Sequence, residues 1–200
     1  KDLPINSLED LDGKVVGSHP SKQVTYFVSQ MLPNATIQQY NPAVPFLSVK
    51  SGDQAAAYVL EPAISMAVTS GEYKLVEKGA ISRHIFGGAR VPAAVSLLSE
   101  NWIENHPIEA AKFIQIARTI QKKEIIQPDI SAHVALLTKK EYGGYSKEVA
   151  SQVVEPISSM PEDLDRKELL KFFQILRNGY LLEGDIDFDK LLYIPSANYR

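Results

Sequence analysis

The chain has 200 residues and 44% hydrophobic side chains, which is enough to bury a globular core and excludes a disordered polymer. Its 21 Lys and Arg against 24 Asp and Glu give a formal net charge of -3, without the basic surplus that binding to nucleic-acid backbones requires. The absence of Cys excludes disulfides, a thiolate nucleophile and cysteine-ligated metals. No apolar run approaches the roughly 18 residues of a membrane-spanning helix.

Strands and helices are predicted to alternate over the first 76 residues. The spacing of apolar residues and the positions of Gly and Pro indicate where these elements begin and end. The first of them is a helical turn that Gly13 closes. Parallel strands need crossover connections, so this order predicts an α/β fold with a mostly parallel sheet flanked by helices. We expect strands at 14–17, 35–40, 55–60 and 74–76, and helices at 24–32, 44–51 (ended by Gly52) and 63–69 (closed by Gly71).

The second half of the sequence predicts helices. Residues 79–90 read as a polar, Gly-rich loop, and 93–98 as an apolar strand where the chain crosses between domains. Two domains follow: an α/β unit over 1–98 with crossing strands at its ends, and a helical segment over 99–200. The expected helices are 107–124, with a stripe of Ala110, Ala111, Phe113, Ile114, Ala117 and Ile120, then 130–139, 147–154 and 163–182, with Leu164, Leu169, Phe172, Phe173, Leu176 and Tyr180 on one face.

The loop after the first predicted strand is the first candidate binding site. Ser18, His19 and Ser21 lie where the chain leaves the carboxyl end of a strand and enters a helix, whose free N–H groups attract anions. Ligands of open α/β sheets bind at those ends. The alternative is that Ser21 only caps its helix.

The end of the third predicted strand gives further candidates. Pro62 suits the first helical position, which puts Glu61 where Ser, Thr, Asp or Asn would ordinarily cap. Glu61 therefore either accepts hydrogen bonds from a ligand, holds an interdomain contact, or only favours the helix start. Tyr58 either reaches the cleft or fills the core. Arg90, beside the predicted crossing, either clamps an acidic ligand or is a solvated loop residue.

Signatures of catalysis are missing from the sequence. It has no Walker A run, no G-x-S-x-G elbow, no H-E-x-x-H and no G-x-G-x-x-G after a strand. Its four histidines, at positions 19, 84, 106 and 133, stand far apart in the sequence, and none has a second His at the helical spacing that would indicate zinc. We therefore expect no catalytic residue, no metal site and no cofactor, and interpret the chain as a binding protein.

Four segments together match one known pattern: residues 7–17 (SLEDLDGKVVG), residues 49–53 (VKSGD) before an Ala-rich strand, Glu61-Pro62, and residues 99–107 (SENWIENHP) before a long helix. In their order and spacing, over residues 5–125, they resemble the solute-binding proteins of nitrate, sulfonate and taurine ABC importers. Ala55 departs from that family, which usually has Asp at the equivalent position.

The resemblance implies a type II periplasmic binding fold, in which two α/β lobes joined by two crossing strands enclose the ligand. Residues 1–98 would form the second lobe and 99–200 would return toward the first lobe, whose N-terminal segment this sequence lacks. The helices at 107–124 and 163–182 are then expected to bury their apolar faces against the second lobe. By position, Ser18, His19, Ser21, Tyr58 and Glu61 would face the cleft.

The implied function is capture of a small anionic or zwitterionic solute and its delivery to the permease subunits of an importer, without chemical change. The location would be the periplasm or the extracellular face of the membrane, with or without a lipid anchor, and the full-length protein would be a monomer. Two alternatives share the fold: an enzyme of thiamine-pyrimidine synthesis, whose cysteines this sequence lacks, and a ligand-sensing domain fused to a regulator.

Overall fold

The protein is described by a computed structural model that covers residues 4–88, 98–126, 129–155, 166–184 and 187. Its first part is an α/β unit around a three-stranded parallel sheet of order β2-β1-β3, as the alternating pattern predicts. The strands are β1 (Val15–Ser18), β2 (Thr36–Gln39) and β3 (Ala56–Ala57). β2 and β3 lie inside their predicted ranges, although β3 is only the start of the strand expected at 55–60, and β1 ends one residue beyond the predicted 14–17.

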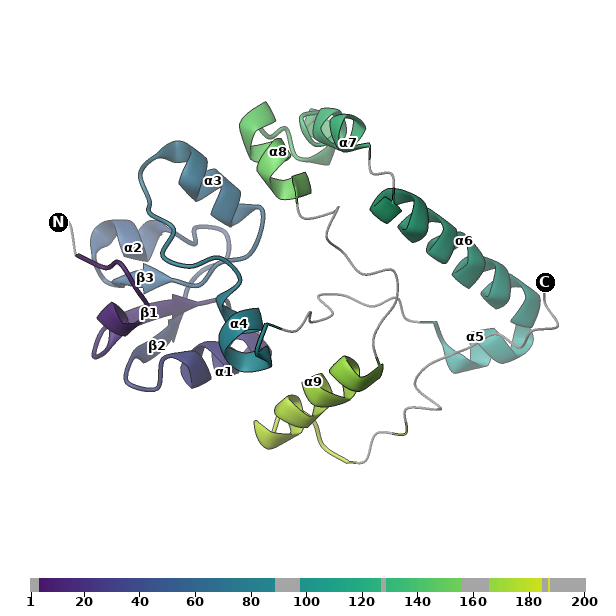
Figure 1. Cartoon of the computed structure of the whole chain (residues 1–200), viewed down its shortest axis with the longest axis horizontal. Helices are drawn as coiled ribbons and strands as arrows, with labels where there is room; N and C mark the ends of the chain where they lie inside the picture. Colours follow the sequence, from purple (N-terminus) through teal and green to yellow (C-terminus); the bar gives the residue numbers. More distant parts are fainter. Residues whose placement is uncertain (1–3, 89–97, 127–128, 156–165, 185–186, 188–200) are drawn as a thin grey trace.

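Helices follow each strand. A 3-10 turn, η1 (Glu9–Leu11), precedes β1, and the helices are α1 (Lys22–Met31), α2 (Leu47–Ser51) and α3 (Ala63–Ser70). Gly52 and Gly71 end α2 and α3 in the left-handed region, at φ of 85° and 71°, where glycine avoids the Cβ strain of other residues. Figure 1 shows α1 on one side of the strands and α3 on the other.

The core of this unit lies between β1 and α1. Leu11, Val16, Val28 and Leu32 are buried together there. Because side chains alternate along a strand, Val16 and Ser18 point toward α1, whereas Gly17 faces the opposite side of the sheet. The two faces of the sheet therefore present different residues near the carboxyl end of β1.

Two predictions for residues 74–90 are wrong. Residues 74–76 form no strand. The ammonium group of Lys74, the first of them, donates to the Asn6 side chain at 2.5 Å. The predicted loop at 79–90 contains a helix, α4 (Ala80–Phe86), bracketed by Gly79 and Gly87 at φ of 72° and 66°. The glycines cap the helix rather than extend the loop, because Phe86, only 2% exposed, packs into an aromatic cluster.

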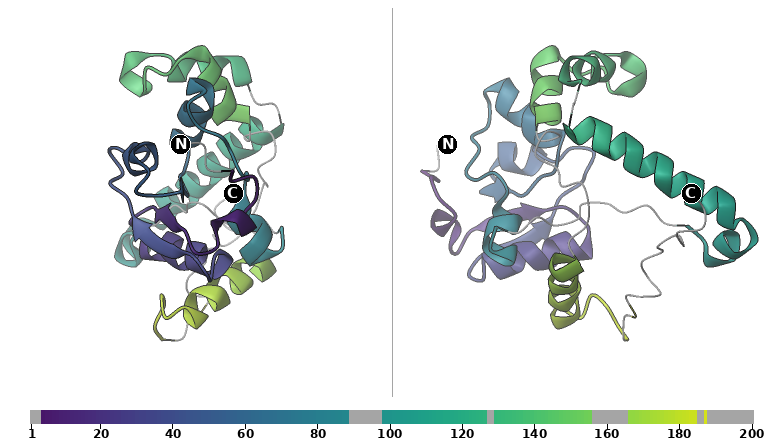
Figure 2. Two further views of the ribbon diagram at one scale, coloured as in Figure 1. Left: turned by 90° about the vertical axis from the view of Figure 1, so that its left-hand side faces the viewer. Right: turned by 45° about the vertical axis from the view of Figure 1, so that its right-hand side comes forward.

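The second half is helical in the part that the structure describes. Figures 1 and 2 place α8 beside α3, and the buried side chains of Val134, Ala150 and Val154 join α7 to α8. Residues 93–97 of the predicted crossing strand lie outside the described residues. The elements are α5 (Glu100–Asn105), α6 (Pro107–Ile126), α7 (Ile130–Leu137), the 3-10 turn η2 (Lys140–Tyr142), α8 (Lys147–Val154) and α9 (Arg166–Asn178).

Helix α9 packs against the α/β unit as predicted. Phe172 and Leu176 join Phe27 of α1 and Phe86 of α4 in one buried cluster. The Phe172 ring lies 5.7 Å from that of Phe86 and 6.4 Å from that of Phe27, between ring centroids. Tyr180, expected on the same face, lies beyond the end of the helix and is 93% exposed.

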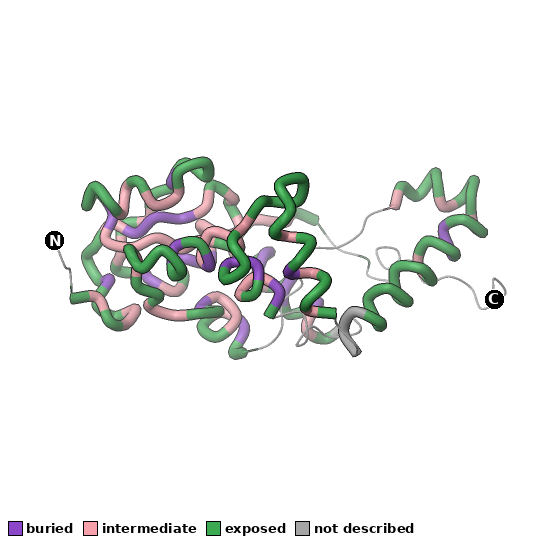
Figure 3. The backbone as a smooth tube through the Cα atoms, turned by 90° about the horizontal axis from the view of Figure 1, so that it is seen from above, coloured by how far each residue is buried: buried purple, intermediate pink, exposed green. Residues whose placement is uncertain are grey.

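The predicted burial of the α6 stripe against the α/β unit is wrong. Ala110 and Ala111 are buried, and α6 packs against the short helix α5. Phe113 and Ile120, however, are 43% and 56% exposed, and most of the helix is exposed in Figure 3. Periodicity predicts that a helix has an apolar face, but it does not say which surface covers that face. Of the helices described, none is both long and apolar enough to cross a bilayer.

Candidate functional site

The carboxyl ends of the three parallel strands form the candidate site. The backbone N–H of Tyr40, after β2, donates to the Ser18 carbonyl at 3.0 Å, and that of Tyr58, after β3, donates to the Gly17 carbonyl at 2.8 Å. Because β2 and β3 lie on opposite sides of β1, the gap between β1 and β3 is a topological switch point, where open α/β sheets bind ligands. The structure thus brings the predicted loop after β1 and Tyr58 to one edge.

The loop between β1 and α1 is held by its own side chains. Ser18 is fully buried, and its hydroxyl donates to the His19 carbonyl at 3.2 Å, which also accepts from the Thr25 hydroxyl at 3.2 Å. The backbone N–H of Ser21 donates to His19 Nδ1 at 3.2 Å. The Ser18 hydroxyl and the His19 ring nitrogen therefore shape the loop.

Ser21 caps α1, which is one of the two roles that the sequence allows for it. Its hydroxyl accepts from the backbone N–H of Val24 at 3.5 Å. The first four N–H groups of a helix have no partner within it, and here those of Ser21 and Val24 are used by the loop. The N–H groups of Lys22 and Gln23 are the two that the helix start offers to solvent or to an anion.

Tyr40 belongs to this edge, although the sequence reasoning did not select it. Its side chain is 6% exposed, and its ring meets that of His19 edge to face, with 6.2 Å between centroids. Burial raises the pKa of Tyr40, and the nearby Tyr58 raises it further; burial also raises the pKa of Tyr58. Both phenols are therefore neutral hydrogen-bond donors at neutral pH. The available signal was the position of Tyr40, at the carboxyl end of a predicted parallel strand.

Glu61 performs the capping role that the sequence left open. Its carboxylate accepts from the backbone N–H of Ser65 at 3.2 Å and from the Ser65 hydroxyl at 2.8 Å, in the first turn of α3. Pro62, expected as the first helical residue, precedes the helix by one position. Glu61 as a whole residue is exposed. Arg90, the remaining predicted contact, lies outside the described residues.

Gln54 is a second group that sequence reasoning missed. It is 4% exposed, and its side-chain oxygen has no hydrogen-bond partner in the described part of the chain. It lies against Gly17, where an added Cβ would come within 3.0 Å of Gln54 Cδ and of Ala57 Cβ. A buried unpaired polar group costs about 1–3 kcal/mol, so this amide is expensive to retain.

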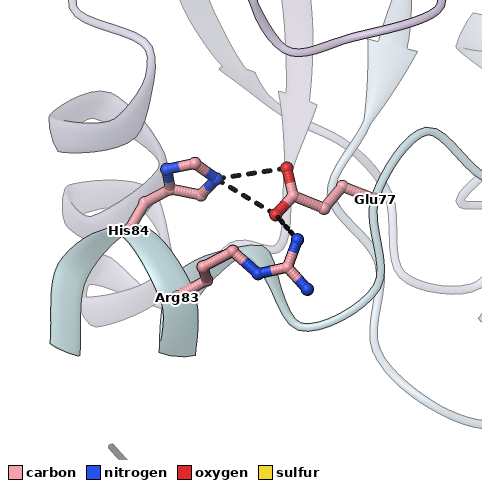
Figure 4. A network of polar contacts seen from close by, with 3 residues as sticks. All are labelled: Glu77, Arg83 and His84. Atoms are coloured by element: carbon pink, nitrogen blue, oxygen red, sulfur yellow. Dashed lines mark hydrogen bonds and ion pairs between the residues drawn. The ribbon is translucent and has the colours of Figure 1, made fainter. Parts of the chain in front are cut away.

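A second polar cluster fastens α4 to the loop before it. In Figure 4 the Glu77 carboxylate lies between two side chains of α4: Arg83 Nη1 donates at 2.8 Å, and His84 Nε2 lies 3.0 Å and 3.1 Å from the two oxygens. The Glu77 carboxyl is mostly buried, while Arg83 is largely exposed. We interpret this arrangement as an ion-pair anchor for the helix.

Metal clusters and surface hollows are two further kinds of feature that could form a site. Within the described ranges, no three His, Asp or Glu side chains gather in a way that could hold a metal ion. Two hollows lie on other surfaces. One is lined by Ile130, Ser151, Gln152 and Glu155, and the other by Tyr26, Gln30, His84, Ile85, Ile175 and Asn178.

Comparisons of this chain with models of known protein families, with curated proteins and with solved structures found no match.

Proposed function

We propose that the chain is part of an extracytoplasmic solute-binding protein of the kind that serves nitrate, sulfonate and taurine ABC importers. In this proposal the α/β unit is one lobe of a type II periplasmic binding fold, and the carboxyl edge of its sheet is one wall of the cleft. The solute is small and anionic or zwitterionic, and the membrane partner is the permease. No bond is made or broken, and no cofactor takes part.

The observation that carries the proposal is the switch point between β1 and β3. The loop 18–21 and Tyr58 lie at this point, and Tyr40 lies across β1 from it, after β2, with its ring against that of His19. Ligands of open α/β sheets bind at this position because adjoining loops diverge there and leave a crevice at the strand ends. A parallel sheet flanked by helices is also what the family resemblance implies.

The chemistry of this edge suits an acidic solute. The start of α1 offers the N–H groups of Lys22 and Gln23 and the positive end of its dipole. The Tyr40 and Tyr58 phenols add neutral donors. Such donors hold an anion without a buried cation, and they release it more readily than a paired charge would.

The exposed face of α6 also supports a two-lobed protein. Phe113, Ile116 and Ile120 form one apolar stripe, and each is at least 43% exposed. Apolar patches of this kind mark surfaces that another part of a protein covers. A companion lobe would cover the stripe and complete the cleft.

Thermal-shift titration with nitrate, ethanesulfonate and taurine at millimolar concentrations tests the proposal. A ligand that binds only the folded state raises Tm as its concentration passes Kd. Ser21→Ala should weaken binding by about tenfold, equivalent to about 1.4 kcal/mol, because it loosens the start of α1. Ser146→Ala is the matched control, since Ser146 caps α8 in the same way, accepting from the Val149 N–H at 3.3 Å.

We expect similar losses of Tm in the two variants, and weaker binding only in Ser21→Ala. If none of the three solutes shifts the Tm of the unmodified chain, the proposal fails. If both cap variants bind as the unmodified chain does, the binding site lies elsewhere.

A further inference from the structure

Gln54 carries a buried polar group that the described fold does not use. Buried amide oxygens in proteins are nearly always hydrogen-bonded, to protein or to ordered water. Gln54 is 4% exposed, and its side-chain oxygen has no partner among the described residues. An aliphatic side chain would fill the same space without leaving an acceptor unpaired. The amide therefore calls for a donor that is not part of the described fold.

The position of the amide connects it to the strand ends. Gln54 precedes β3, where its backbone N–H donates to the Ser48 carbonyl at 3.0 Å. Its side chain extends along the sheet to Gly17 and Ala57, which are paired across β1 and β3. Gly17 is the last but one residue of β1, so the amide lies against this pair of strands, close to their carboxyl ends.

Gly17 and Gln54 are a matched pair. A Cβ at position 17 would overlap the Gln54 side-chain oxygen and would approach Gln54 Cδ to 3.0 Å. Glycine thus leaves the space that the amide fills. Because the side chain of Gln has three rotatable bonds, the oxygen can turn from Gly17 toward the strand ends when a donor arrives there.

We infer that Gln54 Oε1 is the acceptor for an N–H group of the solute, and that this solute carries an amine or amide beside its acidic group. The inference rests on the proposed function and adds the class of ligand. The donors at the edge, namely the start of α1 and the two phenols, suit the acidic end. Glu61 already accepts from Ser65, which leaves Gln54 to serve the other end of a zwitterion.

The test compares taurine with ethanesulfonate, two sulfonates that differ by one amine, in calorimetric titrations of the full chain. The unmodified chain should bind taurine about tenfold or more tightly, the discrimination expected from one buried hydrogen bond. Gln54→Met should bring the two affinities together. Gln54→Glu keeps an acceptor and should keep the preference. Gln152→Met removes an amide on α8 and should change neither affinity.

Stability separates recognition from a structural role. Removal of an unpaired acceptor should leave the Tm of the ligand-free Gln54→Met variant unchanged or higher. Equal affinities of the unmodified chain for the two sulfonates, or an unchanged preference in Gln54→Met, would overturn the inference alone. A lowered Tm with equal loss of both ligands would show the amide to be structural, which also overturns it. If neither sulfonate nor nitrate binds the unmodified chain, the proposed function fails and the inference with it.

Discussion

Replacing Phe172 by Ala tests whether α9 is an integral part of the α/β unit. Phe172 is 9% exposed and touches the rings of Phe27, Phe86 and Phe173, so the change leaves a cavity between three helices. Truncation of a buried Phe to Ala costs about 3–5 kcal/mol. We expect that loss in the free energy of unfolding, measured by urea titration with far-UV circular dichroism at an unchanged m-value.

Leu170→Ala is the matched control on the same helix. Leu170 is 44% exposed, and a substitution away from the core should cost less than about 1 kcal/mol. The double variant of Phe172→Ala with Phe27→Ala should lose less than the sum of the single variants, because aromatic pairs couple by about 0.5–1.5 kcal/mol. Equal small losses in Phe172→Ala and Leu170→Ala would refute the packing of α9 on α1 and α4.

Two predictions concern pH. Asp10 accepts from the backbone N–H groups of Asn6 and Ser7 at 2.8 Å and 3.0 Å, which lowers its pKa below the usual 3.8. Its contribution to stability is present above pH 3.8 and is lost as pH falls through the lowered value, so Asp10→Asn should flatten the acid limb of Tm against pH. Burial raises the pKa of Tyr58 above the usual 10. Its contribution is present below pH 10 and is lost as pH rises through the raised value, so Tyr58→Phe should flatten the alkaline limb; an unchanged slope in either variant would contradict its assignment.

Much of the local structure could be predicted from spacing and punctuation. The helix expected at 147–154 occurs over those residues, with Ser146 as its cap, because the apolar period and the capping residue agree there. The sequence predicts a loop in place of helix α4, because glycines such as Gly79 and Gly87 occur both in loops and at the ends of helices. Packing of Phe86 against Phe27, with 5.4 Å between ring centroids, selects the helical alternative.

The candidate site was predictable where chain order alone places a residue. The loop 18–21 and Tyr58 follow strands, and parallel strands must end at the same edge. The sequence does not indicate Tyr40 and Gln54, because their place in the candidate site depends on how deeply their side chains are buried. The 6.2 Å contact between the Tyr40 and His19 rings, and the amide of Gln54 beneath Gly17, follow from strand register and from what covers each face.

The sequence by itself determined the alternation of strands and helices as far as α3 and the parallel direction of the strands, because these depend on short-range periodicity and on the length of the connections. Only the tertiary structure decided that Glu61 caps α3, that α9 rather than α6 packs on the α/β unit, and that one amide oxygen is buried without a partner. Those outcomes depend on which surfaces meet, and burial acts between residues far apart in the chain, where no local pattern records it.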